Sequence, residues 1–257
     1  MIDVEDLTFS YTRETSPILK NFSLKLVEDK SVSIMGANGS GKTTLSRCLN
    51  GLLLPESGTV RVDGLDTRQK DENLKIRALV GMVFQNPDNQ IVSTTVEREV
   101  AFGLENLEVP YEEMHRRVEA ILRQFGLEKY RHKSPHYLSG GEKQLLALAS
   151  IFVMSPKYII LDEPTSLLDP ASREKILDAV FELREKSGII PILITQFPEE
   201  TLRTDRLILL HKGKIVFDEK PADVFEHEKE LREIGIGVPL YFSLKPQLEK
   251  LHLWGVV

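Results

Sequence analysis

The stretch Gly36-Ala37-Asn38-Gly39-Ser40-Gly41-Lys42-Thr43 fits the phosphate-binding pattern G-x-x-x-x-G-K-[ST]. The apolar run Val32–Met35 before it predicts a short buried strand. The residues after it show the apolar spacing of a helix, at Leu45, Cys48, Leu49, Leu52 and Leu53. We therefore expect the loop between a strand end and a helix start, where free N–H groups and the helix dipole favour an anion.

Two residues at the end of this loop have the chemistry to bind a nucleotide. The Lys42 ammonium can contact the β- and γ-phosphates, and the Thr43 hydroxyl can coordinate Mg²⁺. The alternative is a glycine-rich turn that matches the pattern by chance. The strand and helix predicted on either side favour the phosphate site.

A pair of carboxylates follows a second apolar run, in Ile159-Ile160-Leu161-Asp162-Glu163. Ligands bind at the carboxyl ends of strands in open α/β sheets. We therefore predict that one acidic residue holds Mg²⁺ and that the other orients or deprotonates the attacking water. Acidic pairs after strands also occur as helix caps, and the phosphate loop upstream favours the catalytic interpretation.

A second anion site is predicted in Leu138-Ser139-Gly140-Gly141-Glu142, where a serine and two glycines open an apolar segment. One nucleotide does not need two phosphate sites in the same chain. We therefore expect Ser139–Gly141 to serve a nucleotide held by another subunit.

Length and composition limit the alternatives. The 257 residues suffice for a large core, and the net charge of −6 argues against broad nucleic-acid binding. A single cysteine, Cys48, excludes a disulfide within the chain and is expected in the core. The longest nearly apolar run, Leu145–Met154, is shorter than the roughly 20 residues of a membrane-spanning helix. The N-terminus lacks the pattern of a signal peptide, so membrane association is expected through a partner.

The pattern of elements predicts an α/β fold, a P-loop NTPase core with an antiparallel β subdomain and an inserted helical subdomain. The expected boundaries are 1–220 for the ATPase domain, about 86–156 for the helical insertion and 221–257 for a C-terminal extension. Strands are predicted at Leu7–Tyr11, Phe22–Leu26, Thr59–Asp63, Val80–Phe84, Tyr158–Leu161, Ile189–Ile194, Leu207–Leu210 and Ile215–Asp218. Helices are predicted over Met114–Phe125, over Leu145–Met154 and from Asp169-Pro170 onward.

Together these motifs resemble the ATPase subunits of ATP-binding-cassette (ABC) transporters. The motif set is Gly36–Thr43, Gln85, Leu138–Glu142, Asp162-Glu163 and Ser166–Asp169. Further stretches are similar to the energy-coupling-factor group, the ATPases of vitamin and cobalt/nickel importers: Gln85–Gln90, Val100–Leu107 and Arg232–Pro239.

This resemblance implies ATP and Mg²⁺ as cofactors and a role for each matching residue. The ATP-binding set is Tyr11, Gly36, Ala37, Asn38, Gly39, Ser40, Gly41, Lys42, Thr43 and Thr44, with Ser139, Gly140 and Gly141 closing over the partner's nucleotide. Catalysis is assigned to Glu163 as base, with Gln85, Gln196 and Lys42, and the metal to Thr43, Gln85 and Asp162. From the residues alone, the default interpretation of Tyr11 is a strand aromatic in the core. Gln85 alone could equally be a polar residue at a strand end.

The chain departs from the family pattern at one position of chemical consequence. Gln196 stands where the family places a histidine that contacts the γ-phosphate. Glutamine still donates a hydrogen bond but cannot take up a proton. We therefore predict slow hydrolysis at this chain's own site and a different, histidine-bearing cassette as natural partner. Glu142 and Leu145 also replace the usual glutamine and arginine, with little expected effect.

Three functional hypotheses remain at this stage. The first is the motor of a membrane importer, on the cytoplasmic face of the membrane, with a transmembrane coupling subunit and a substrate-binding membrane subunit. Its coupling surface is expected near Gln85–Thr95, with Ile91 and Val92 as contacts. The second is a cassette acting on DNA or ribosomes, which the acidic balance and the short segment between Thr43 and Leu138 disfavour. The third is an ATP-binding subunit with little hydrolysis, which Gln196 favours.

Overall fold

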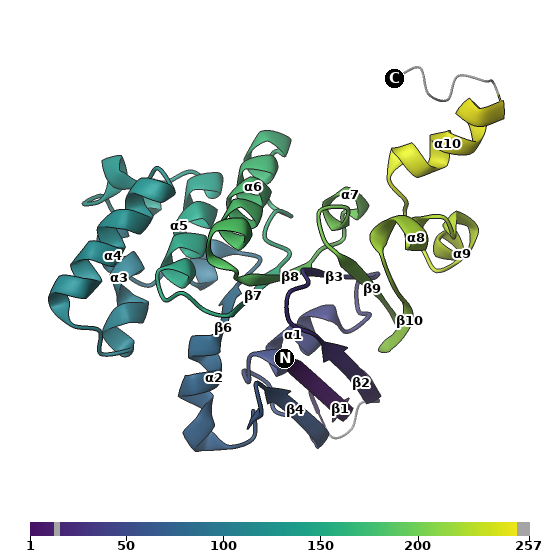
Figure 1. Cartoon of the computed structure of the whole chain (residues 1–257), viewed down its shortest axis with the longest axis horizontal. Helices are drawn as coiled ribbons and strands as arrows, with labels where there is room; N and C mark the ends of the chain where they lie inside the picture. Colours follow the sequence, from purple (N-terminus) through teal and green to yellow (C-terminus); the bar gives the residue numbers. More distant parts are fainter. Residues whose placement is uncertain (13–15, 251–257) are drawn as a thin grey trace.

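The computed structural model describes residues 1–12 and 16–250. Its centre is a six-stranded sheet in which all neighbours are parallel except the last pair, at one edge (Figure 1). In spatial order the strands are β6 (Val80–Val83), β7 (Tyr158–Asp162), β8 (Ile190–Ile194), β3 (Val32–Met35), β9 (Arg206–His211) and β10 (Lys214–Glu219). Every residue of β3, β6, β7 and β8 is buried, which explains their continuous apolar sequences.

A second sheet of four antiparallel strands lies beside the first. Its strands are β2 (Leu19–Leu26), β1 (Ile2–Phe9), β4 (Ser57–Val62) and the short β5 (Leu65–Asp66). The sequence prediction differs in several details. β2 begins at Leu19 and not Phe22, and β4 spans Ser57–Val62 and not Thr59–Asp63. β1 starts at Ile2 and ends at Phe9, so Tyr11 is not a strand residue, and β5 was not predicted.

The helix after the phosphate loop, α1 (Lys42–Leu49), is shorter than its apolar spacing predicted. Asn50 caps its C-terminus, and Gly51 has a φ of +71°, which leaves the right-handed helical path. The prediction that the stripe extends to Leu53 was therefore wrong, and Leu52 is 41% exposed.

Four longer helices lie together on one side of the central sheet (Figure 1). They are α3 (Val96–Asn106), α4 (Tyr111–Gln124), α5 (Gly140–Phe152) and α6 (Pro170–Ser187). The N-terminus of α6 has the predicted chemistry, because the Asp169 carboxylate accepts from the Ser172 N–H at 3.0 Å and Pro170 is its first residue. The helix α2 (Asn73–Leu79) was not predicted. Short 3-10 turns cover Lys70–Glu72, Pro87–Asn89, Glu128–Tyr130 and Pro135–Tyr137.

The central sheet takes part in two hydrophobic cores. Successive side chains of a strand point to opposite faces, and β7 illustrates this. Tyr158 and Ile160 belong to a core shared with α1 and the antiparallel sheet, the sheet core. Ile159 and Leu161 belong to a core shared with α3, α4, α5 and α6, the helical core.

The remaining helices follow β8 and β10. They are α7 (Pro198–Thr201), α8 (Pro221–Phe225), α9 (Glu228–Glu233) and α10 (Leu240–Lys250). Val224, Phe225 and Leu231 pack against Met35 and other residues of β3 and β9. Residues 251–257 of the predicted C-terminal extension lie outside the described residues.

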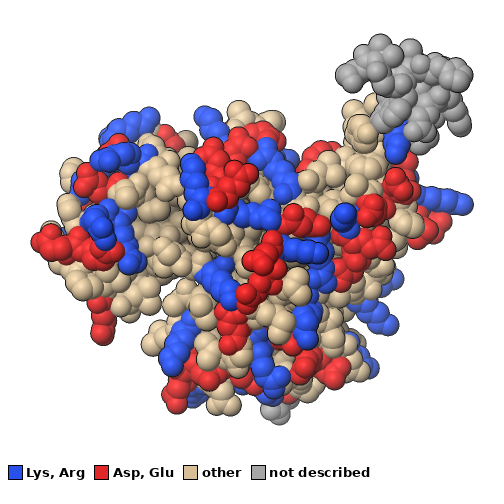
Figure 2. Space-filling model, viewed as in Figure 1, with Lys and Arg blue, Asp and Glu red and all other residues tan. Residues whose placement is uncertain are grey.

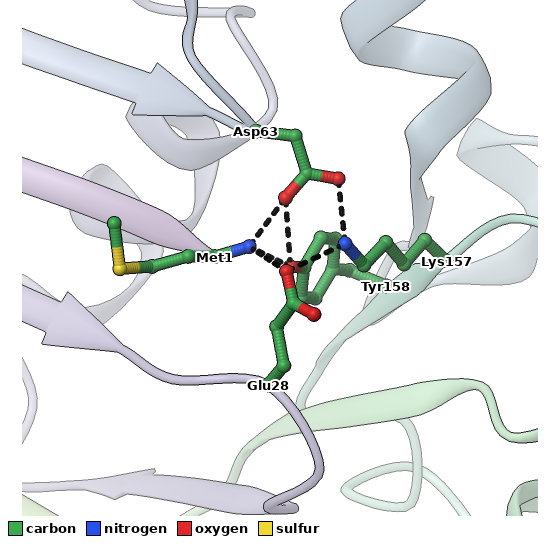
Figure 3. A network of polar contacts seen from close by, with 5 residues as sticks. All are labelled: Met1, Glu28, Asp63, Lys157 and Tyr158. Atoms are coloured by element: carbon green, nitrogen blue, oxygen red, sulfur yellow. Dashed lines mark hydrogen bonds and ion pairs between the residues drawn. The ribbon is translucent and has the colours of Figure 1, made fainter.

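A polar network joins the antiparallel sheet to the start of β7 (Figure 3). Lys157 donates to Glu28 and to Asp63, each at 2.8 Å, and the Tyr158 hydroxyl donates to Asp63 at 3.2 Å. The amine of Met1 donates to the same two carboxylates. The network therefore fastens the two sheets at the end of β7 opposite to Asp162.

Acidic and basic side chains alternate over the face seen in Figure 2, without a large region of one sign. Over the described part of the chain, no helix is both long and apolar enough to cross a bilayer.

Candidate functional site

The predicted phosphate loop lies between β3 and α1, as its sequence context required. Gly36 has a φ of +156°, and a Cβ there would lie 2.2 Å from the Leu210 carbonyl oxygen, so a side chain cannot be accommodated. The Lys42 ammonium donates to the carbonyl oxygens of Gly36 at 2.7 Å and Ala37 at 3.2 Å. The lysine is thereby folded back over the loop, with the helix N-terminus behind it.

The loop contains a buried lysine ammonium and one buried hydroxyl that has no hydrogen-bond partner in the described part of the chain. The Ser40 hydroxyl oxygen is buried and, within the described residues, has no hydrogen-bond partner. Lys42 is 4% exposed; burial lowers its pKa, while Glu163 and Asp162 act in the opposite direction. Buried polar groups are normally paired, so this arrangement fits a bound anion such as a phosphate chain.

Thr43 and Asp162 meet across the gap between α1 and β7. The Thr43 hydroxyl donates to Asp162 Oδ1 at 3.2 Å. Burial raises the pKa of Asp162, and the Thr43 hydrogen bond opposes that rise. Hydroxyl and carboxylate oxygens are ligands that Mg²⁺ prefers, and a divalent cation would supply the missing counter-charge. Among residues 1–12 and 16–250, no three histidine, cysteine or carboxylate side chains gather as a metal site.

Glu163 is held in an uncommon backbone conformation beside Gln85. Its φ is +50°, and its N–H donates to the Ile194 carbonyl at 2.9 Å. The Gln85 amide donates to Glu163 Oε2 at 3.2 Å and to the Ser166 hydroxyl at 3.1 Å. The structure thus brings together two of the residues predicted to act on the attacking water.

Tyr11 lies next to the loop, not in the core. The side chain is 53% exposed, and its ring meets the Phe9 ring edge-on at 5.2 Å. Its hydroxyl lies 3.3 Å from the Thr44 hydroxyl. The core alternative is therefore wrong for Tyr11, whereas stacking on adenine remains a prediction.

Gln196 follows β8, the strand next to β7. Asp162 pairs with Ile194 in the parallel ladder, which brings Gln196 to the same end of the sheet as Asp162 and Glu163. Its side chain is exposed. The Gln196 amide, at the position where the resemblance places a histidine, is therefore open to solvent.

The second anion site lies at the N-terminus of α5. Ser139 caps this helix in a capping box with Glu142, whose carboxylate accepts from the Ser139 N–H at 2.9 Å. Ser139 and Gly140 are exposed. No hydrogen bond of the described residues connects Ser139–Gly141 with Gly36–Thr43. The two predicted anion sites are therefore separate features of the chain.

A family model described as ABC transporter matches residues 19–166 of this chain. The chain belongs to the ABC transporter ATPase family.

The similarity of this ABC ATPase to relatives extends over nearly its whole length. It is 44% identical over 253 residues to the energy-coupling factor transporter ATP-binding protein EcfA1 of Caldanaerobacter subterraneus subsp. tengcongensis, covering 97% of this chain and 91% of that protein. It is 46% identical over 251 residues to the cobalt import ATP-binding protein CbiO of Syntrophus aciditrophicus, covering 98% and 89%. The structure of cbiO1 from Clostridium perfringens, part of the ABC transporter complex cbiONQ, superimposes with a TM-score of 0.81 at 32% identity, covering 95% and 98%.

Contacts that the sequence did not predict connect the segment after Gln85 with α5 in this ABC ATPase. Gln90 accepts from the Phe84 N–H at 3.2 Å and donates to the Ala147 carbonyl at 3.0 Å. Lys143 pairs with Asp88 at 2.7 Å. The contacts of Gln90 with Ala147 and of Asp88 with Lys143 tie the segment after Gln85 to α5, and no local pattern could have revealed them because these partners are far apart in sequence.

Proposed function

We propose that this ABC ATPase energises a membrane importer of the energy-coupling-factor type that takes up vitamins or transition-metal ions. The motif set supports this, as do relatives named as energy-coupling factor and cobalt import proteins. The proposed location is the cytoplasmic face of the membrane, bound to a transmembrane coupling subunit and through it to a substrate-binding subunit.

The observation that carries the proposal is the arrangement of Lys42, Thr43 and Asp162 around the phosphate loop. Lys42 would contact the β- and γ-phosphates, and Thr43, Asp162 and Gln85 would hold Mg²⁺. The metal would neutralise charge that develops on the phosphates. Glu163, already paired with Gln85, would accept a proton from the attacking water.

The exposed Ser139–Gly141 segment supports a two-cassette enzyme. A serine cap and free N–H groups at a helix start bind anions, and a second cassette can present its γ-phosphate there. Gln196 favours unequal cassettes, with this chain's own site the slower one and a histidine-bearing partner at the other. A homodimer as the sole species isolated from native membranes would refute the unequal pairing.

A groove beside β6 fits the membrane subunit. It has a volume of about 470 Å³ and lies between α2, α3 and α5, with Leu74, Met82, Phe102 and Met154 in its lining. Leu74 is 78% exposed and Phe102 46% exposed. Exposing large apolar side chains to water is unfavourable, so these residues suit contact with an apolar helix face of a partner. Ile91 and Val92, the contacts expected from sequence, do not line this groove, and Ile91 packs against the helical core.

Replacing Glu163 by Gln tests the proposal. The variant keeps the phosphate loop but loses the base, so it should bind Mg²⁺-ATP, hydrolyse it at least about 10²-fold more slowly and accumulate as a closed dimer. Size-exclusion chromatography with and without ATP measures this, with Glu163→Gln/Lys42→Ala as the control that cannot bind phosphate. A monomer in every condition, alone and with the native partner cassette, would contradict the model.

A further inference from the structure

A buried glutamate, Glu200, lies in α7 outside the residues assigned so far. It is 3% exposed, and buried glutamates are rare unless they are paired. Each carboxylate oxygen accepts one hydroxyl: Thr165 donates to Oε1 and Thr195 to Oε2, both at 2.5 Å. Both threonines are fully buried. One side chain thus bridges two loops that leave the same end of the central sheet.

The first of these loops carries the proposed base. Thr165 is two residues after Glu163, and its neighbour Ser166 donates to the Glu163 carbonyl at 3.0 Å. Ser166 also accepts from the Gln85 amide at 3.1 Å. The backbone that Glu200 fixes at Thr165 therefore sets the place of both Glu163 and Gln85.

The second loop carries Gln196. Thr195 donates its N–H to the Ile34 carbonyl at 3.2 Å, and its hydroxyl accepts from the Phe197 N–H at 3.0 Å. Gln196 is thereby held on both sides by residues attached to the Glu200 cluster. The backbone on both sides of Gln196 is therefore fixed by contacts of Thr195 and Phe197.

The Arg173 guanidinium lies near the buried Glu200 carboxylate without forming a hydrogen bond to it. Arg173 Nε lies 3.8 Å from Glu200 Oε1 and has no hydrogen-bond partner among the described residues, while its guanidinium stacks on the Phe197 ring at 3.7 Å. Burial raises the pKa of Glu200, and hydrogen bonds from Thr165 and Thr195 oppose the rise. Two hydroxyl donors and a nearby guanidinium suit the ionised form.

We propose that Glu200 is a positioning residue of the ATPase reaction, which holds the Glu163 loop and the Gln196 loop in one relative geometry through Thr165 and Thr195. It does not touch the nucleotide. The inference rests on the function proposed above for Glu163 and Gln196.

The variant Glu200→Gln has the same size but exchanges an acceptor oxygen for an NH₂ donor, so one threonine loses its acceptor. Displacing catalytic groups by about 1 Å costs on the order of 10²-fold in rate. We expect kcat for Mg²⁺-ATP to fall about 10- to 100-fold, while the Kd of a fluorescent ATP analogue changes less than about twofold. The control is Glu199→Gln, the exposed neighbour in the same helix, which should leave both values unchanged.

A second pair of variants keeps the test independent of folding defects in Glu200→Gln. Thr195→Val removes the hydroxyl and should reproduce the fall in kcat, whereas Thr195→Ser keeps it and should restore wild-type turnover. In addition, kcat of the double variant Glu200→Gln/Gln196→Ala should fall by a smaller factor than the product of the two single-variant factors, because both substitutions act through one loop.

Three outcomes would overturn the inference: wild-type kcat in Glu200→Gln, equal losses in Thr195→Ser and Thr195→Val, or multiplicative losses in the double variant. Failure of the wild-type chain, alone and with its native partner cassette, to hydrolyse Mg²⁺-ATP would instead refute the proposed function itself.

Discussion

The substitution Gln196→His restores the residue that the ABC family places after β8. Gln196 is exposed and lies at the Asp162 end of the sheet. If Gln196 contacts the γ-phosphate as proposed, a histidine ring at this position would replace that contact. Both side chains donate a hydrogen bond, and the difference is the charge of the imidazolium. Hydrogen bonds involving a charged group are stronger than neutral ones by about 1–1.5 kcal/mol. That difference corresponds to roughly a tenfold increase in rate.

Single-turnover hydrolysis of γ-labelled ATP measures this gain between pH 6 and 8. An unperturbed histidine has a pKa of about 6.5, so the advantage of Gln196→His over wild type should be larger at pH 6 than at pH 8. Gln196→Ala is the matched control: it loses the donor entirely and should fall below wild type by more than the histidine variant rises above it. A histidine variant no faster than wild type at pH 6 would refute the reasoning.

Two further predictions concern the groove and the network of Figure 3. Leu74→Glu should abolish co-purification with the membrane subunits and spare ATP binding. The control is Val216→Glu, because Val216 is 42% exposed and lies in β10 at the opposite edge of the sheet; this variant should retain both co-purification and ATP binding. Lys157→Met should lower the free energy of unfolding at pH 7 by about 1 kcal/mol, the upper range for partly exposed ion pairs. Burial alone would raise the pKa of Asp63, but hydrogen bonds from Lys157 and the Met1 amine lower it overall. This contribution is therefore present above the unfolded pKa near 4 and lost as the pH falls through the lower folded value, so the difference in unfolding free energy between wild type and Lys157→Met should shrink progressively as the pH falls below about 4.

The sequence was informative where structure follows from local pattern. The phosphate loop, its flanking strand and the buried strands β7 and β8 depend on glycine spacing and continuous apolar runs, and the comparisons confirm the fold class. Helix α2 escaped prediction because Asn73–Leu79 is short and has one buried residue, Ile76, so its spacing carries no period. The end of α1 was misplaced because leucines continue the stripe beyond Gly51, whose backbone turns away.

The Glu200 cluster could not be predicted for a different reason. Its four members come from α6, from α7 and from the ends of β7 and β8, and nothing in their local sequences marks them as neighbours. Only the parallel pairing of β7 with β8 brings Thr165 and Thr195 within reach of one carboxylate. Tyr11 was assigned through the family resemblance, since alternation alone placed it in a strand.

The division of β7 between two cores has a consequence for protein engineering. Ile159 and Leu161 contribute to the helical core, together with Val83 of β6 and Leu193 of β8. A shortened version lacking the predicted helical insertion, about residues 86–156, would leave these strand residues covered only by α6. It should therefore aggregate instead of serving as a minimal nucleotide-binding unit. The same strand ends in Asp162, so repacking either face by directed evolution should disturb the end proposed to bind the metal. Grafting a foreign helical insertion onto this chain therefore requires matching the β6, β7 and β8 side chains along with the loop ends.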